Sequence, residues 1–111
     1  KSIHYYAALY KGYTVGYVDF QDNEDSVKVL GLAVLEEFQG QGIGTRMLNI
    51  ALDFAEGRGK RVDILVGAQN VAAQELYRRH GFEMKGKLEK HISGQEVMLM
   101  TKPAPQKGAA G

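Results

Sequence analysis

The feature that most constrains this chain is a run of alternating glycines, at positions 40, 42 and 44, between an apolar segment and an amphipathic one. Before the glycines, VKVLGLAVL (residues 27–35) predicts a strand buried on both faces, because its apolar residues run almost without alternation. After them, apolar residues recur at helical spacing: Ile43, Met47, Ile50, Ala51 and Phe54. A second apolar run, RVDILVGA, predicts the next strand. Residues 27–67 therefore predict a strand, helix and strand crossover unit, with the glycines at the N-terminus of its helix.

The glycines have two interpretations. A helix N-terminus carries unpaired N–H groups and the positive end of the helix dipole, which together favour a phosphate. Alternatively, Gly40 and Gly42 only form a tight turn between strand and helix. A P-loop is excluded because Thr45 and Arg46, rather than a Lys-Ser or Lys-Thr pair, follow Gly44. A dinucleotide fingerprint that starts at Gly40 is excluded because its third glycine position holds Thr45.

The rest of the chain predicts further strands and one more helix. Aromatic and β-branched residues dominate IHYYAALY and YTVGYVDF, and the Lys-Gly pair between these runs predicts a hairpin. Asn70 is placed to cap a second helix, VAAQELYRRH, which ends at Gly81. Two final strands, FEMKGKLEKHI and EVMLMTK, flank an SGQ turn. The predicted fold is α/β, in the order β-β-β-α-β-α-β-β, with a mixed, mostly antiparallel sheet around the crossover unit.

Length and composition limit the classes of function. A chain of 111 residues has room for one domain, which we expect to span residues 1–102, with residues 103–111 as a flexible tail. The 14 Lys and Arg balance 13 Asp and Glu, so a net charge of +1 predicts binding to neither nucleic acid nor membrane. The absence of cysteine and of a membrane-length apolar run fits a cytoplasmic protein. His4 and His91 lack the spacing of a metal site, so no metal is expected.

Two motifs in sequence order connect this pattern to a known family. The first is Gln39-x-x-Gly42-x-Gly44, directly after the strand that ends in LAV. The second, N-x-x-A-x-x-L-Y-x-x-x-G-F, is matched by Asn70, Ala73, Leu76, Tyr77, Gly81 and Phe82. Together the motifs resemble the GCN5-related N-acetyltransferases, over roughly residues 3–102. The resemblance implies acetyl-CoA as co-substrate, a primary amine as acceptor, and direct attack through a tetrahedral intermediate.

The resemblance also implies where acetyl-CoA binds. Backbone N–H groups of the glycine loop hold the pyrophosphate, and the strand before the loop splays away from the next strand, so that the pantetheine arm pairs with its free edge. A main-chain N–H within Leu32–Val34 polarises the thioester carbonyl. The implied cofactor-binding residues are Leu32, Ala33, Val34, Gln39, Gly40, Gln41, Gly42, Ile43, Gly44, Thr45, Asn70 and Tyr77. Asn70 has a second interpretation, as a simple helix cap.

The resemblance assigns Tyr77 as the general acid that protonates the leaving thiolate. The ordinary pKa of a phenol, about 10, lies not far above that of a thiol, about 8.5, so the transfer is chemically reasonable. The other interpretation of Tyr77 is an aromatic residue on the core face of its helix. At positions where relatives carry a glutamate or histidine that acts as the general base, this chain has Lys28, Leu30 and Leu65. Asp63 is the candidate base, and a relay of water molecules is the alternative.

A second function is compatible with these motifs. A regulatory or truncated module would bind acyl-CoA without turning it over; the missing base favours this hypothesis and Tyr77 opposes it. Relatives in the family begin with a strand and two helices before the hairpin, whereas here the predicted hairpin follows Lys1 almost at once. Sheet edge or apolar surface should therefore be uncovered. We expect an upstream segment or a second copy of the chain, forming a homodimer, to cover it.

Overall fold

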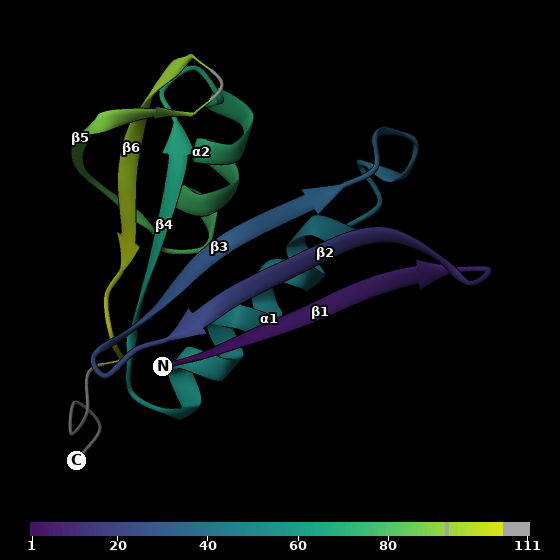
Figure 1. Cartoon of the computed structure of the whole chain (residues 1–111), viewed down its shortest axis with the longest axis horizontal. Helices are drawn as coiled ribbons and strands as arrows, with labels where there is room; N and C mark the ends of the chain where they lie inside the picture. The colour runs from purple at the N-terminus through teal and green to yellow at the C-terminus, as the bar shows by residue number, and fades with distance from the viewer. Residues whose placement is uncertain (93, 106–111) are drawn as a thin grey trace.

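The computed structural model describes residues 1–92 and 94–105, and shows a six-stranded sheet in the order β1-β2-β3-β4-β6-β5 (Figure 1). The β3–β4 pair is parallel and the other four pairs are antiparallel, which confirms the predicted mixed, mostly antiparallel sheet and the predicted order of elements. The strands are β1 (Ser2–Tyr10), β2 (Tyr13–Asp22), β3 (Ser26–Val34), β4 (Arg61–Gly67), β5 (Glu83–Ile92) and β6 (Gln95–Lys102). The helices are α1 (Ile43–Gly57) and α2 (Val71–Arg79), and a short 3-10 turn, η1 (Glu36–Phe38), was not predicted.

The predicted N-terminal hairpin is confirmed. Its two-residue turn places Lys11 at φ 50° and Gly12 at φ 85°, the pair of positive φ values that a tight hairpin turn requires. The hairpin extends well beyond the C-terminal strands (Figure 1), and β1 forms one edge of the sheet. Because β1 has a neighbouring strand on one side only, most of its residues are exposed.

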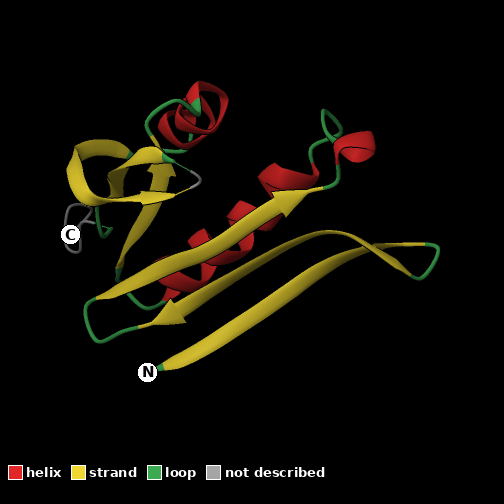
Figure 2. Ribbon diagram, turned by 45° about the horizontal axis from the view of Figure 1, so that its top comes forward, coloured by secondary structure: helices red, strands yellow, loops and turns green. Residues whose placement is uncertain are grey.

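Helix α1 packs against one face of the sheet and contacts β1, β2, β3 and β4 (Figure 2). The predicted apolar stripe was too narrow, because Leu48, Leu52 and Ala55 are also buried. Three members of that stripe, Ile43, Ile50 and Phe54, are only partly buried at the margin of the core. A helix that contacts four strands buries more of its circumference than one narrow stripe, which explains the difference.

Strand β3 pairs with β4 only along its first half. The parallel pairing joins Ser26–Val29 to Arg61–Ile64, after which the two strands diverge visibly (Figure 1). On its other side, β3 continues to pair with β2, but with a bulge that leaves Leu30 without a partner. The prediction that this strand is buried on both faces is wrong for its second half, where Leu30 is 45% exposed. The reason is that β3 loses one neighbouring strand where it diverges.

Helix α2 is fixed at both ends as the sequence predicted. The Asn70 side chain accepts a hydrogen bond from the Ala73 N–H at 3.2 Å, which confirms its role as helix cap. The chain leaves the helix through Gly81 at φ 93°, a conformation that favours glycine. The buried Gln74, which sequence reasoning missed, donates from Nε2 to the carbonyls of Gly67 at 3.1 Å and Ala68 at 2.9 Å. These bonds tie α2 to the diverging end of β4.

Two observations concern what the described residues lack. They include no helix with the length and apolarity needed to cross a membrane. Among the side chains that are described, no three from His, Asp or Glu are grouped so that they could hold a metal ion. Of the predicted tail, residues 106–111 lie outside the described residues, as does Ser93 of the predicted SGQ turn.

Candidate active site

A groove of about 570 Å³ lies between the second half of β3, the start of α1 and one side of α2. Ten of the twelve predicted cofactor-binding residues line it, so the fold brings together segments that are far apart in the sequence. They are Leu32, Ala33, Val34, Gln39, Gly40, Gly42, Gly44, Thr45, Asn70 and Tyr77. The other lining residues were not predicted to bind the cofactor, and all come from α2: Ala72, Ala73, Leu76 and Arg79.

The glycine loop forms one wall of this groove. Gly40 and Gly42 have φ values of 80° and 86°, and a Cβ at either position would meet no atom within 4 Å. These glycines are therefore needed for backbone conformation rather than for close packing inside the chain. Gly42 caps α1 without a side-chain hydrogen bond, and the first turn holds no acidic residue. The first N–H groups of α1 are thus left for an anion.

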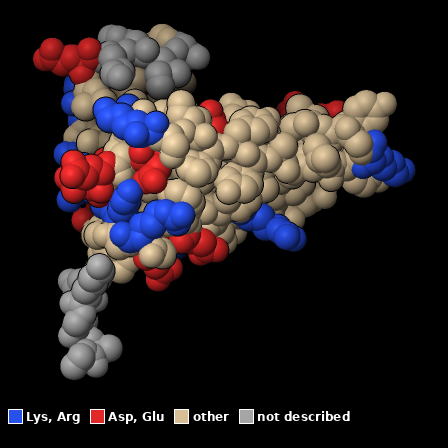
Figure 3. All heavy atoms as spheres, turned by 60° about the horizontal axis from the view of Figure 1, so that its bottom comes forward, with Lys and Arg blue, Asp and Glu red and all other residues tan. Residues whose placement is uncertain are grey.

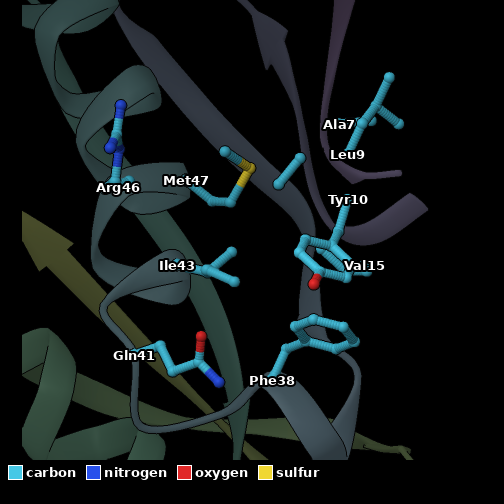
Figure 4. Close-up of a pocket in the computed structure, with 10 residues that line it drawn as sticks. Ala7, Leu9, Tyr10, Val15, Phe38, Gln41, Ile43, Arg46 and Met47 are labelled. Carbon is cyan, nitrogen blue, oxygen red and sulfur yellow. The ribbon is translucent and has the colours of Figure 1, made fainter. Parts of the chain in front are cut away.

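Gln41 and Ile43 are the two predicted residues that do not line the groove. They line a separate hollow of about 650 Å³ between α1, η1 and the far end of the hairpin (Figure 4). Its wall includes Tyr10 and Phe38, whose ring centroids lie 5.4 Å apart. Because the loop turns sharply through Gly40 and Gly42, successive side chains point to different sides, which the sequence spacing did not indicate.

The open edge of β3 points specific backbone groups toward the groove. The Val34 carbonyl accepts a hydrogen bond from Gln39 Nε2 at 3.0 Å, whereas the Leu35 N–H pairs with the Val15 carbonyl of β2 at 2.9 Å. In a strand the N–H and carbonyl of one residue point to the same side, and the side alternates along the chain. The main-chain groups of Leu32 and Val34 therefore face the open edge, and those of Ala33 face β2.

A second hollow, of about 280 Å³, occupies the gap between the diverging strands β3 and β4. We call it the cleft. Leu32, Asn70 and Tyr77 line both the cleft and the groove, so the two hollows meet at these residues. Tyr17, Leu30 and Gly31 line the cleft but not the groove. The arrangement can bring two different ligands together at Tyr77.

Tyr77 is largely buried, with 7% of its surface exposed and its ring 5.6 Å from that of Phe82. Burial raises the pKa of its phenol above the ordinary value of 10.0, because the charged form is poorly solvated there. The phenol therefore stays protonated at neutral pH. Tyr77 belongs to the buried core and also lines both the groove and the cleft. Its two interpretations, as a core aromatic residue and as a residue of the site, are therefore compatible.

Asp63 lies in the paired first half of β4, directly opposite Lys28 of β3 and Thr101 of β6. Its carboxylate accepts a hydrogen bond from Thr101 Oγ1 at 2.8 Å and forms an ion pair with Arg61 Nε at 3.3 Å. It lines neither the groove nor the cleft. The structure does not bring this predicted base together with Tyr77.

The outer surface of the hairpin is apolar, as expected for a sheet edge without a covering element. Figure 3 shows a broad uncharged area along it. The exposed large side chains of β1 are Ile3, Tyr5, Tyr6, Leu9 and Tyr10, with exposed fractions from 42% to 66%. A patch of this kind is typical of a surface that another element or chain covers.

Comparisons with known proteins agree with this fold. A model of the "Acetyltransferase (GNAT) family" matches residues 1–82. The chain is 29% identical over 112 residues to a spermine/spermidine N(1)-acetyltransferase of Bacillus subtilis, covering 89% of this chain and 72% of that protein. It is 35% identical over 103 residues to the N-alpha-acetyltransferase RimI of Mycobacterium tuberculosis, covering 87% and 64%.

Among solved structures, Naa50 of Arabidopsis thaliana in complex with the bisubstrate analogue CoA-Ac-MVNAL superposes with a TM-score of 0.80. The sequences are 23% identical, and the match covers 88% of this chain and 71% of that one. The chain thus spans about two thirds of the length of these relatives. The likeness to Naa50 shows that the fold is shared.

Two glycine substitutions separate backbone strain from packing in the loop. We expect Gly42→Ala to destabilise the protein by about 1–2 kcal/mol, because a residue with a Cβ is strained at a left-handed φ. Gly44→Ala is the matched control: Gly44 lies in α1, and its Cβ would make only an ordinary contact 3.7 Å from Val34 Cγ2. It should leave stability unchanged or raise it by about 0.5 kcal/mol. Urea denaturation measures both effects, and equal effects of the two variants would contradict the interpretation.

Proposed function

Because the chain belongs to the acetyltransferase (GNAT) family, we propose that it transfers an acetyl group from acetyl-CoA to a primary amine by direct attack on the thioester. The observation that carries the proposal is the meeting of groove and cleft at Leu32, Asn70 and Tyr77. A donor in the groove and an acceptor in the cleft would react beside the one phenol that lines both hollows.

The groove fits an acyl-CoA. The free N–H groups at the start of α1 would bind the pyrophosphate, and Arg79 on the rim would add a positive charge. The open edge of β3 offers the main-chain groups of Leu32 and Val34 to the amides of the pantetheine arm, as a strand edge does to an extended peptide. The Naa50 neighbour, solved with a CoA-containing analogue, supports this assignment.

The residues at the meeting point supply two parts of the chemistry. An N–H of Leu32 or Val34 donates to the thioester oxygen, which gains negative charge as the amine nitrogen bonds to the carbonyl carbon. When the carbon–sulfur bond breaks, the Tyr77 hydroxyl gives its proton to the departing thiolate. The raised pKa of Tyr77 keeps that proton available at neutral pH.

The attacking amine must first lose a proton. Asp63 is engaged with Thr101 and Arg61 and lines neither hollow, so we assign this step to water in the cleft rather than to Asp63. The acceptor itself is proposed only as a primary amine. The two curated relatives are named for different amines, polyamines in one case and an N-alpha amine in the other.

The first prediction of this proposal concerns Tyr77. The purified chain should bind acetyl-CoA in calorimetry and release free thiol with at least one amine from a panel of polyamines and short peptides. Tyr77→Phe keeps the ring in the core but removes the acid, so we expect kcat to fall about 100-fold. The Kd for acetyl-CoA should stay within about twofold, because the phenol acts on the leaving group and not on ground-state binding.

Tyr13→Phe is the matched control, since Tyr13 is 76% exposed at the hairpin turn and should retain full activity. Binding of acetyl-CoA without thiol release in the wild type would favour the alternative of a non-catalytic acyl-CoA-binding module. No binding would contradict both functions.

Arg79 offers a second prediction. Arg79→Ala should weaken acetyl-CoA binding about tenfold at low salt, because a charge-assisted contact to phosphate is lost, and by less at high salt, where the charge is screened. Arg78→Ala is the matched control: it removes the same charge from the neighbouring position of α2, which does not line the groove. Calorimetry at two salt concentrations measures the Kd of each variant for acetyl-CoA. Equal losses of affinity in the two variants would contradict a specific contact of Arg79 and show that only net charge matters.

Asp63→Asn tests whether water, rather than Asp63, removes the proton from the attacking amine. The amide still accepts the hydrogen bond from Thr101, so we expect kcat/KM and its pH profile to change by less than about threefold. A loss of about 100-fold, the size typical of removing a general base, would instead identify Asp63 as the base.

A further inference from the structure

A carboxylate and a phenol converge over the backbone of Gly31, at the point where β3 diverges from β4. Asp19 is the β2 partner of Gly31, and a Cβ built on Gly31 would lie 2.8 Å from Asp19 Oδ1 and 2.9 Å from the Tyr17 hydroxyl oxygen. Only a glycine leaves this space free. The Asp19 carboxylate and the Tyr17 hydroxyl can therefore both lie against the backbone of β3 at Gly31. The bulge at Leu30 lies directly beside them.

This pair belongs to the face of the sheet opposite α1. Val18 and Phe20 are fully buried in the core that α1 covers, and Tyr17 and Asp19 alternate with them along β2. Alternate residues of a strand point to opposite faces. Tyr17 and Gly31 also line the cleft that leads to Tyr77. Tyr17 therefore lines the cleft on the face away from α1, and the Asp19 carboxylate lies beside the cleft lining, over Gly31.

Asp19 is only half-buried, and among the side chains that the structure describes it has no ion-pair partner. Two other carboxylates of the sheet contrast with it. Asp22 forms an ion pair with Lys60 at 2.5 Å, and Asp63 forms one with Arg61. A negative charge without a cation, next to a phenol oxygen and an aromatic face, offers hydrogen-bond acceptors and cation–π attraction to an ammonium group.

We infer that Asp19 and Tyr17 bind the protonated amino group of the acceptor at the mouth of the cleft. The inference rests on the proposed function and adds a charge requirement to it: the acceptor arrives as an ammonium with an apolar stem and without a neighbouring carboxylate. The apolar stem would lie against the half-exposed Leu30 and the Tyr5 ring, which stacks on Tyr17 with centroids 5.7 Å apart. From this position the amino group has a path to Tyr77 through the cleft.

The test measures amine binding apart from turnover. Butylammonium and butyrate, of similar length and opposite charge, are titrated by NMR into the whole chain, with and without acetyl-CoA. The Gly31 amide and the Tyr17 ring signals report binding. We expect the wild type to bind butylammonium and not butyrate, and Asp19→Asn to weaken butylammonium binding about tenfold. Tyr17→Phe, which keeps the ring but removes the hydroxyl, should weaken it less.

Asp53→Asn is the matched control, because it removes the same charge from an exposed site on α1, and it should bind butylammonium as the wild type does. For any amine that is acetylated, Asp19→Asn should raise KM about tenfold while the Kd for acetyl-CoA stays constant. Equal binding of butylammonium by Asp19→Asn and wild type, or no binding by the wild type, would overturn the inference. Failure to bind acetyl-CoA would instead overturn the proposed function, and the amine titration would still decide the role of Asp19.

Discussion

The early end of the β3–β4 pairing is the constraint on which the rest of the site depends. The two parallel strands share hydrogen bonds only from Ser26 and Arg61 as far as Val29 and Ile64. Beyond that point the backbone of β3 has one free edge, and the gap forms a cleft that joins the groove beside α1 and α2. Unpaired backbone groups are costly when buried, so a sheet with this gap is stable only if solvent or a ligand satisfies them.

Several side chains reduce that cost at the open ends of the strands. Gln39 donates to the Val34 carbonyl of β3, and Gln74 donates to the carbonyls of Gly67 and Ala68 after β4. Asn70 binds the first turn of α2 in the same region. Each of these bonds fixes the chain next to one strand end, and the other main-chain groups of Leu32 and Val34 are left for a ligand. The site is therefore preorganised by amide side chains rather than by ion pairs.

The sequence predicted the turns and caps that local residue patterns control. It missed the side-chain exposures and directions that depend on how the strands and helices pack together. The hairpin turn, the turn through Gly40 and Gly42 and the Asn70 cap depend on the residue types at one or two positions, and all lie where the sequence predicted them. The exposure of Leu30 was missed because an unbroken apolar run does not reveal where a strand loses its neighbour. The side-chain directions of Gln41 and Ile43 and the position of Arg79 on the groove depend on tertiary packing, which spacing along one chain does not specify.

The sheet also separates two kinds of charge. The groove carries helix N–H groups and Arg79, which suit the phosphates of the proposed donor, whereas Asp19, beside the cleft on the other face, suits a cationic acceptor. With a net charge of only +1, the chain has no overall field that would favour either ligand. Local fields on opposite faces can therefore attract an anion and a cation at once. Because the cleft passes between β3 and β4, the two reactants can meet at Tyr77 without competing for one entrance.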